Sequence, residues 1–227
     1  MLISVTFVSM PPAGTSHGIE RAAARATTKG ELTRRALLDA AIARFGRDGY
    51  RSTSVADIAR DASLGGTVAY TYFADKEALF FAALDEDAAA AIGEGLAATF
   101  EHLDLSDWRR NLLVTLIASL QDHPLARRLL AGLEPEVTAR VLETPALNEL
   151  RKVCAERLAA DQLAGVVRSD IDPHAIANGI VAILLSLIMS VVQLGNDAAG
   201  PYTDDVVTVF EAALLPPSGA TGRTRSG

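Results

Sequence analysis

Apolar residues recur at intervals of three and four along most of this chain, the spacing that places them on one face of an α-helix. The first clear run covers residues 32–48, where Leu38, Ala41 and Phe45 share a face and Gly49 follows as a helix-ending residue. No stretch of useful length alternates between apolar and polar positions, which is the pattern of a half-buried strand. The pattern predicts an all-α protein.

Residues 53–76 predict two short helices joined by a tight turn. Ser54, with Asp57 three residues later, suits the capping of a helix that starts at Val55. The turn contains Gly65 and Gly66, which tolerate unusual backbone angles and the close approach of another backbone. A second helix of about two turns is expected to follow.

The second of these helices carries small, hydroxylated and aromatic residues on its outer sides, and Ala69 and Phe73 suit its buried stripe. Hydroxyl groups bond to phosphates or base edges, and a valine methyl can touch a thymine methyl. Asp75 then suits the cap of a further helix, where the ammonium of Lys76 and free backbone N–H groups could hold a phosphate. Periodicity alone fits a helical hairpin with surface tyrosines equally well.

A set of spaced residues between Leu32 and Leu79 favours the DNA-reading interpretation. The set comprises Ala40-Ala41, Phe45, Gly49-Tyr50, Thr53, Asp57-Ile58-Ala59, Tyr70, Tyr72-Phe73 and Lys76-Glu77-Ala78-Leu79. With these residues the segment resembles the DNA-binding domain of the TetR family of transcriptional regulators, over 48 of 227 residues. The resemblance implies an N-terminal three-helix bundle with a helix-turn-helix, followed by a larger C-terminal helical domain for ligand binding and dimerisation.

The chain departs from the family pattern in the turn and in the recognition helix. It has Ser63, Gly65-Gly66 and Thr71 where the family usually has a glycine, a small polar plus a basic residue, and a histidine. The recognition helix therefore has no positive side chain, and affinity would depend on Lys76, Arg51 and a basic N-terminal arm. The residues expected to contact DNA are Arg51, Thr53, Gly65, Gly66, Thr67, Val68, Tyr70, Thr71, Tyr72 and Lys76.

Charge is divided unevenly along the chain. Residues 1–76 hold 10 Lys/Arg and 7 Asp/Glu, a net +3, and the remainder holds 11 and 21, a net −10, which together give the −7 of the whole chain. A basic head on an acidic body directs phosphate contacts to one end. The expected domains are a flexible basic arm (1–30), a helix-turn-helix domain (31–76), a helical ligand-binding and dimerisation domain (77–215) and a disordered tail (216–227).

The N-terminal segment carries two open alternatives. Arg21, Arg25 and Lys29 lie among small polar residues, so the arm either tracks phosphates or is a solubilising tail. Residues 1–10 are apolar but have no preceding basic residue, which makes a poor signal peptide. A translation start at Met10 or later is an equally good interpretation.

The rest of the chain predicts further helices at 75–101, 106–121, 124–132 and 135–165, with a break at Pro145. Gly93 and Gly95 each weaken the first of these by about 1 kcal/mol relative to alanine, so a bend could form there. Such a bend could pass a ligand-driven motion to the head. An apolar pocket is expected to involve Phe100, Trp108, Leu112, Leu116, Ile176 and Met189, with ordinary core packing as the alternative for each.

Residues 175–196 contain no charged residue, which is long enough for a membrane span. Asp172-Pro173 begins this segment like a soluble helix, and an all-round apolar helix is also expected when one side is buried in its own domain and the other in a dimer. The resemblance implies that helices at about 173–195 and 203–215 pair with their copies in a four-helix bundle.

Enzymatic chemistry has little support in the sequence. His17, His102, His123 and His174 are far apart, and the single Cys154, on an apolar helical stripe, excludes an intrachain disulfide framework. We therefore expect no catalytic residues, no metal and no cofactor, and a reduced cytoplasmic setting.

The resemblance implies a homodimeric, ligand-responsive transcriptional repressor. It would bind a near-palindromic double-stranded DNA operator and be released by an unknown small-molecule effector. Two alternatives remain: a constitutive DNA-binding regulator or activator without an effector, and a membrane-associated helical protein that binds no DNA.

Overall fold

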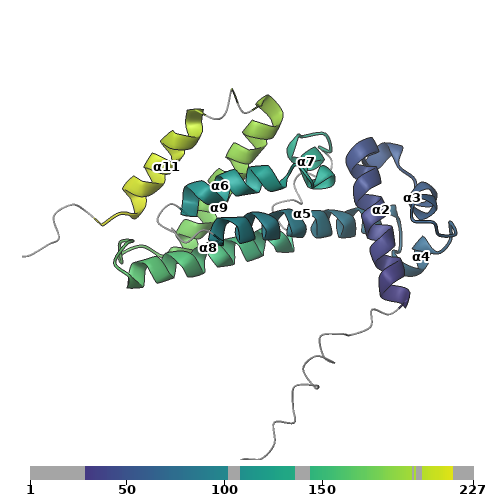
Figure 1. The fold of residues 1–227 in the computed structure, drawn as a ribbon, viewed down its shortest axis with the longest axis horizontal. Coiled ribbons are helices and arrows are strands. Elements are labelled where there is room, and N and C mark those ends of the chain that lie inside the picture. Colours follow the sequence, from purple (N-terminus) through teal and green to yellow (C-terminus); the bar gives the residue numbers. More distant parts are fainter. Residues whose placement is uncertain (1–28, 102–107, 136–143, 196, 198–200, 217–227) are drawn as a thin grey trace, which may run out of the picture.

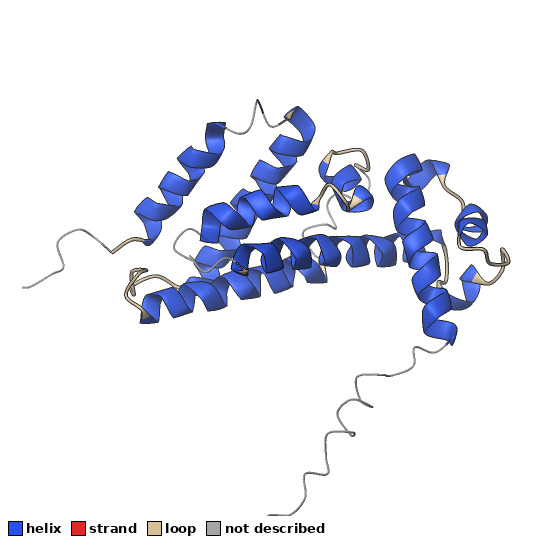
Figure 2. Cartoon of the chain, viewed as in Figure 1, coloured by secondary structure: helices blue, strands red, loops and turns tan. Residues whose placement is uncertain are grey.

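The computed structural model describes residues 29–101, 108–135, 144–195, 197 and 201–216. Over these ranges the secondary structure consists of helices, with no strand (Figure 2). The all-α prediction is confirmed. Nearly all of the predicted arm and tail lies outside the described residues.

A single long helix, α5, runs from one group of helices to another (Figure 1). We call α2, α3, α4 and the first turns of α5 the head, and the remaining described helices the body. The head helices and α5 are α2 (Lys29–Ser52), α3 (Val55–Asp61), α4 (Ala69–Tyr72) and α5 (Lys76–Phe100). The body helices are α6 (Trp108–Ser119), α7 (Pro124–Leu130), α8 (Pro145–Leu163), α9 (Pro173–Leu194) and α11 (Pro201–Leu214).

The head closes around a small group of aromatic rings. Phe45 of α2 and Tyr50 each lie edge to face with Phe80 of α5, at centroid distances of 5.0 Å. Fully buried Ile58 of α3 and Ala69 of α4 belong to the same core. Because edge-to-face rings add specific contacts to the burial of apolar area, α2 and α5 form a fixed base for the two short helices.

The helical geometry of α2 breaks at Gly49, as predicted. Gly49 has φ 83° and ψ 168°, in the region that favours glycine. The hydroxyl of Thr53 donates to the Gly49 carbonyl oxygen over 2.8 Å, and Thr53 is only 3% exposed. This bond fixes the link between α2 and α3.

The body core is mainly aliphatic, with Leu112, Leu158 and Leu184 among its buried residues, and it also contains the buried rings of Trp108 and Phe210. Helix α5 continues through Gly93 and Gly95 as one element, so neither glycine ends it. A Cβ at residue 95 would lie 2.7 Å from Leu116 Cδ2, and therefore this glycine allows α6 to pack closely on α5.

Helix α7 joins the head to the body. Its Leu125 and Leu129 are buried in the head core, whereas its Ala126 belongs to the body core. A Cβ on Gly46 of α2 would lie 2.7 Å from Pro124 Cβ, so the two helices touch directly. Movement of α7 would therefore disturb both cores.

A second contact at this joint is polar. The carboxylate of Glu134, 8% exposed, accepts hydrogen bonds from Tyr50 N at 3.1 Å and Arg128 Nε at 2.7 Å. The Tyr50 N–H directly follows the break at Gly49. Glu134 thus ties the end of α2 to the segment after α7.

Helix α9 is long and apolar enough to cross a membrane by length and composition. Its Ala177, Val181, Leu184 and Ile188 are nevertheless buried in the body core. Only 28% of its most apolar window is buried, so much of the helix presents an uncovered apolar face. The core helix of a soluble protein and a membrane span both pass this test, and packing against the body accounts for one side of α9.

Candidate functional site

Helix α3 begins at Val55 with Ser54 as its cap, as predicted. The Ser54 hydroxyl accepts a hydrogen bond from Asp57 N at 3.1 Å and donates one to Asp57 Oδ2 at 2.7 Å. The hydroxyl bond, followed by the charges of Arg60 and Arg44, lowers the pKa of Asp57. The start of the helix-turn-helix is therefore stabilised by bonds between nearby residues of the chain itself.

The turn between α3 and α4 differs from the prediction in the residue that takes the unusual conformation. Ser63 has φ 58°, the left-handed region that favours glycine, while Gly65 and Gly66 lie outside it. Leu64 N donates to Ala59 O at 2.8 Å and closes the turn. A Cβ on Gly66 would meet no atom within 4 Å, so neither strain nor space within the chain requires glycine there.

Helix α4 is one turn long, shorter than the predicted two turns, and ends where Phe73 becomes extended at φ −134°. Ala69 and Phe73 are buried, so the predicted inner stripe is confirmed. Tyr70 is 57% exposed, and Thr71 is also exposed beside it. The segment from Leu64 to Phe73 has no charged side chain.

The other predicted DNA-contacting residues fall into two groups. Arg51, Gly65, Gly66 and Thr67 are exposed. Val68, Tyr72 and Lys76 are half-buried. Thr53 differs from the prediction, because it is buried and its hydroxyl is bonded to Gly49. It therefore supports the end of α2 and is not available to DNA.

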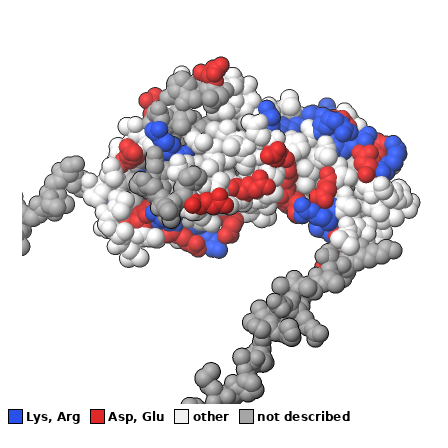
Figure 3. Space-filling model, viewed as in Figure 1, with Lys and Arg blue, Asp and Glu red and all other residues white. Residues whose placement is uncertain are grey.

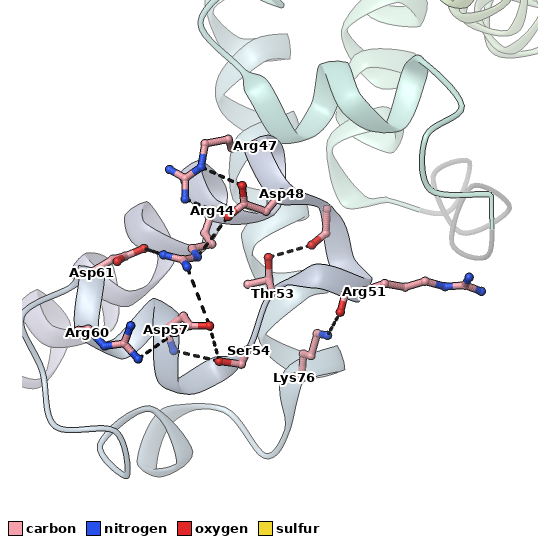
Figure 4. A network of polar contacts seen from close by, with 11 residues as sticks. Arg44, Arg47, Asp48, Arg51, Thr53, Ser54, Asp57, Arg60, Asp61 and Lys76 are labelled. Carbon is pink, nitrogen blue, oxygen red and sulfur yellow. Dashed lines mark hydrogen bonds and ion pairs between the residues drawn. The ribbon is translucent and has the colours of Figure 1, made fainter.

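Lys76 lies against the head, with Nζ 4.4 Å from the centre of the Tyr50 ring and 3.5 Å from Arg51 O, to which it donates. Asp75 Oδ1 accepts from Ala78 N at 2.7 Å, so part of the predicted phosphate site at the start of α5 is filled by the cap itself. The Arg51 side chain points away from the polar network of the head (Figure 4). Lys76 and Arg51 thus place positive charge beside, not within, the helix-turn-helix segment.

Most arginines of α2 and α3 are paired with aspartates of the same helices (Figure 4). Arg44 Nη1 lies 2.7 Å from Asp61 Oδ2, and Arg60 Nη2 lies 2.9 Å from Asp57 Oδ1. Since these pairs lie at the surface, water screens them and each adds little stability. On the face shown in Figure 3, charges of both signs cover the edge of the head next to a tip that is largely uncharged.

Sequence reasoning missed Arg34, an exposed residue of α2. Its guanidinium carbon lies 5.4 Å from the centre of the Phe73 ring, which places a cation beside the end of α4. The two residues are far apart in the chain, so only the fold brings this cation to the helix-turn-helix.

The body contains a cavity of about 70 Å³ between α5, α6, α7, α8 and α9. Ala88 and Ala91 of α5 form part of its wall, opposite Leu184 and Leu185 of α9. Over the described residues the wall presents apolar atoms only. The hydroxyl of Ser119, also in the lining, donates to Leu116 O at 2.9 Å and is thus already bonded.

The six residues predicted for a ligand pocket are not gathered around this cavity. Leu116 lines it, whereas Trp108 and Leu112 are buried in the body core elsewhere. Phe100 and Ile176 are partly buried against that core, and Met189 is half-buried on α9. The signal that could have found the cavity is the pair of small residues, Ala88 and Ala91, on the inner face of α5, because small side chains leave space between helices.

A buried polar cluster at the start of α7 was also missed. Asp87 of α5 is 3% exposed, and its Oδ2 accepts from Leu125 N at 3.0 Å and Ala126 N at 2.8 Å. His123 Nδ1 lies 2.8 Å from Asp87 Oδ1, and Nε2 lies 3.2 Å from Glu94 Oε2. Asp87 therefore caps a helix in another part of the chain.

The carboxylates of Asp87 and Glu94 favour the protonated form of His123. Burial opposes its positive charge, but hydrogen bonds to Asp87 and Glu94 and their negative charges raise its pKa above the ordinary value. His17 and His102 lie outside the described residues, and no cluster of metal-binding side chains is found in the described ranges. Burial raises the pKa of Cys154 to about 12, which keeps this thiol protonated and unreactive.

Comparison with protein families gives a match over residues 37–83 to the family of bacterial regulatory proteins called the tetR family. The matched segment spans the described head from α2 into α5. A search of the curated proteins gives no match.

Solved structures extend the likeness to most of the chain. A TetR-family transcriptional regulator from Mesorhizobium loti matches 83% of this chain and 100% of its own, with 22% identity and a TM-score of 0.66. One from Pectobacterium atrosepticum matches 84% and 99%, with 23% identity and a TM-score of 0.62. The fatty acid degradation regulator FadR from Bacillus halodurans matches 78% and 93%, with 19% identity and a TM-score of 0.59. At these identities the likeness shows a shared fold.

Proposed function

The chain carries the DNA-binding domain of the TetR family of transcriptional regulators, and from this premise we propose that it is a ligand-responsive repressor. It binds a near-palindromic operator as a homodimer and is released by a small-molecule effector. The observation that carries the proposal is the helix-turn-helix itself. Its two helices share a core with α2 and α5, and outer residues of the segment, such as Tyr70, are exposed.

We propose that DNA contacts two surfaces of the head. One is the uncharged tip, the segment from Leu64 to Phe73, and the other is its basic flank, formed by Arg51 and Lys76. Tyr70, Thr67 and Thr71 offer hydroxyl groups to base edges and phosphates. Gly65 and Gly66 are exposed and have no packing reason to be glycine, which suits a close approach of the backbone to DNA. The further proposed contacts are Val68 and Tyr72 of the tip and Arg51 and Lys76 of the flank.

The homodimer is proposed to form through α9 and α11. The outer face of α9 bears small residues that allow helices to approach closely, and these are Ala175, Gly179, Ala182 and Ser186. Val209 of α11 is 62% exposed, and Leu215, directly after the helix, is 49% exposed. A partner helix pair would cover both faces, and two-fold symmetry would place the two heads in successive major grooves about 34 Å apart.

The cavity supports the effector part of the proposal. An effector that binds more tightly to the DNA-free arrangement of the dimer lowers DNA affinity by the same coupling free energy. A constitutive regulator, or an activator without an effector, would need no such cavity, so the cavity favours the ligand-responsive form. The proposed setting is the cytoplasm, where the operator is found.

Selection of bound sequences from random duplex DNA tests this function. The purified full chain and a Tyr70→Ala, Lys76→Ala double variant are compared, with Lys152→Ala as a control, because Lys152 is exposed on α8 in the body. The parent and the control are expected to enrich the same near-palindromic sequence, and the double variant to enrich none. If the folded parent enriches no sequence at low salt, the regulator proposal is wrong and the apolar face of α9 favours the membrane-associated alternative.

A further inference from the structure

The body cavity has a wall that limits the chemistry of its occupant. Five helices contribute to it, and over the described residues their side chains present apolar atoms to the interior. A charged or strongly polar molecule would lose its water without gaining hydrogen bonds in return. We infer that the cavity binds an uncharged, apolar small molecule. That this molecule is the effector rests on the proposed function.

A buried carboxylate beside the wall, that of Asp87, already has hydrogen-bond partners. Asp87 follows Leu84 and precedes Ala88, both of which line the cavity. Its Oδ2 accepts from both Leu125 N and Ala126 N, and its Oδ1 lies against His123 Nδ1, as described above. Asp87 therefore serves α7 and offers no bond to a ligand.

The volume of the cavity also limits the size of the molecule that it can hold. At about 70 Å³, and with about 10–15 Å³ needed for each water-sized group on this measure, it has room for about five such groups. An apolar chain or ring of about five or six carbon atoms fills this space, and a longer chain such as that of 1-octanol requires the lining side chains to move apart. A polar end group on such a chain would also lie among apolar side chains.

Helix α7 gives the occupant a route to the head. Leu129 lines the cavity and is also buried in the head core, 2% exposed. Ala126 and Leu130 of the same helix lie in the wall. A ligand that presses on these residues moves a helix that touches α2 through Pro124 and Gly46.

The test uses 1-octanol and octanoate, which share a chain length and differ in charge. Isothermal titration calorimetry on the full chain at pH 7.5 measures both. Burying a carboxylate without partners is costly, so we expect octanoate to bind at least about tenfold more weakly than 1-octanol. Equal binding of the two probes, or no binding of 1-octanol, would overturn the inference.

Two substitutions locate the binding site. Ala88→Leu fills the cavity and is expected to weaken 1-octanol binding at least about tenfold, in line with the loss of space for the chain. Ala89→Leu makes the same change on the exposed side of α5 and should leave binding unchanged. Leu185→Phe provides a second filling variant if Ala88→Leu does not fold. Retained binding in a folded filling variant would place the ligand elsewhere and contradict the inference.

A separate measurement distinguishes failure of this inference from failure of the proposed function. Operator selection by the same preparation reports on DNA reading without any ligand. If the parent selects an operator but binds no 1-octanol, the ligand class is wrong and the regulator proposal stands. If it binds 1-octanol in the cavity but selects no operator, the ligand class stands and the regulator proposal fails.

Discussion

The head and the body are both helical, but they are packed in different ways. The head core is built on the rings of Phe45, Tyr50 and Phe80, and its short helices are fixed by polar bonds such as that of Ser54. The body core is mainly aliphatic, with Trp108 and Phe210 as its buried rings, and it encloses a cavity and leaves apolar faces uncovered on α9 and α11. The head is thus constructed as a rigid unit, whereas the body has space and surface for further partners.

For the proposed function, the difference would join a fixed surface for DNA to a domain with room for an effector. Rigid positioning of Tyr70 and its neighbours would preserve the shape of the proposed DNA-binding surface. A cavity in the same unit would loosen that shape, because packed interiors respond to the loss of even small groups. Helix α7, whose Leu129 belongs to the head core and to the cavity wall, is the place where the two kinds of packing meet.

The largest expected effect is that of Phe80→Ala, which removes the ring at the centre of the head. The substitution should lower the free energy of unfolding by about 3–5 kcal/mol. Urea unfolding measures the loss, and hydrogen exchange should rise more in residues 37–83 than in α8 and α9. The exposed Tyr70→Ala is the control for stability. Equal loss of protection in both regions would show that the head is not a unit of its own.

Asp87→Ala should have the next largest effect because it leaves two N–H groups of α7 and one side of His123 without their partner. Since hydrogen bonds to charged groups contribute about 1.5–3 kcal/mol, we expect a loss of about 2–3 kcal/mol in the free energy of unfolding. Asp122→Ala, an exposed neighbour of α7, serves as the matched control. A loss no larger than that of the control would argue against α7 as a firmly held joint.

Ser54→Ala removes the cap of α3 and should cost about 1 kcal/mol. The effect should be confined to the head, because the capping bonds join Ser54 only to Asp57. Hydrogen exchange of α3 would rise while that of α9 stays constant. Ser52→Ala, an exposed change two residues earlier, should leave both unchanged. A rise that extends to α9 would mean that the two regions are more tightly coupled than their packing indicates.

The smallest expected effect is the pH dependence contributed by His123. Its folded pKa lies above the ordinary 6.5, because its bonds to Asp87 and Glu94 outweigh the effect of burial. Its stabilising contribution is therefore complete below pH 6.5 and is lost as the pH rises through the folded pKa. The difference in unfolding free energy between the parent and His123→Gln should shrink from pH 6 to pH 8.5. An unchanged difference, or the same trend in the exposed His174→Gln, would contradict this assignment.

The elements that local sequence rules describe well were predicted. The break at Gly49, the start of α3 after Ser54 and the buried pair Ala69 and Phe73 follow from capping, glycine and periodicity. The resemblance through residues such as Tyr72-Phe73 led to the family, which the family comparison then matched. Each of these signals lies within a few residues of the feature that it predicts.

Features that depend on distant pairs were not predicted. Asp87 caps α7 from 38 residues away, and Leu129 lies in two cores at once. A pocket was predicted to involve Trp108 and five other residues, whereas of these six only Leu116 lines the cavity, together with small residues such as Ala88. The unusual backbone angles of the turn were attributed to Gly65 and Gly66, but Ser63 takes the left-handed conformation, and local bonds such as that from Leu64 N to Ala59 O close the turn.

The central claim is that the head contacts DNA and the body does not. Its most direct test compares Lys76→Ala in the head with Lys152→Ala in the body. Fluorescence anisotropy gives the affinity of each variant for the selected operator over a range of salt concentrations. Loss of a phosphate contact from each head should weaken binding about tenfold or more and reduce the magnitude of the salt slope by about 2 per dimer. Lys152→Ala should match the parent in both. Equal affinities and salt slopes for the two variants would contradict the account.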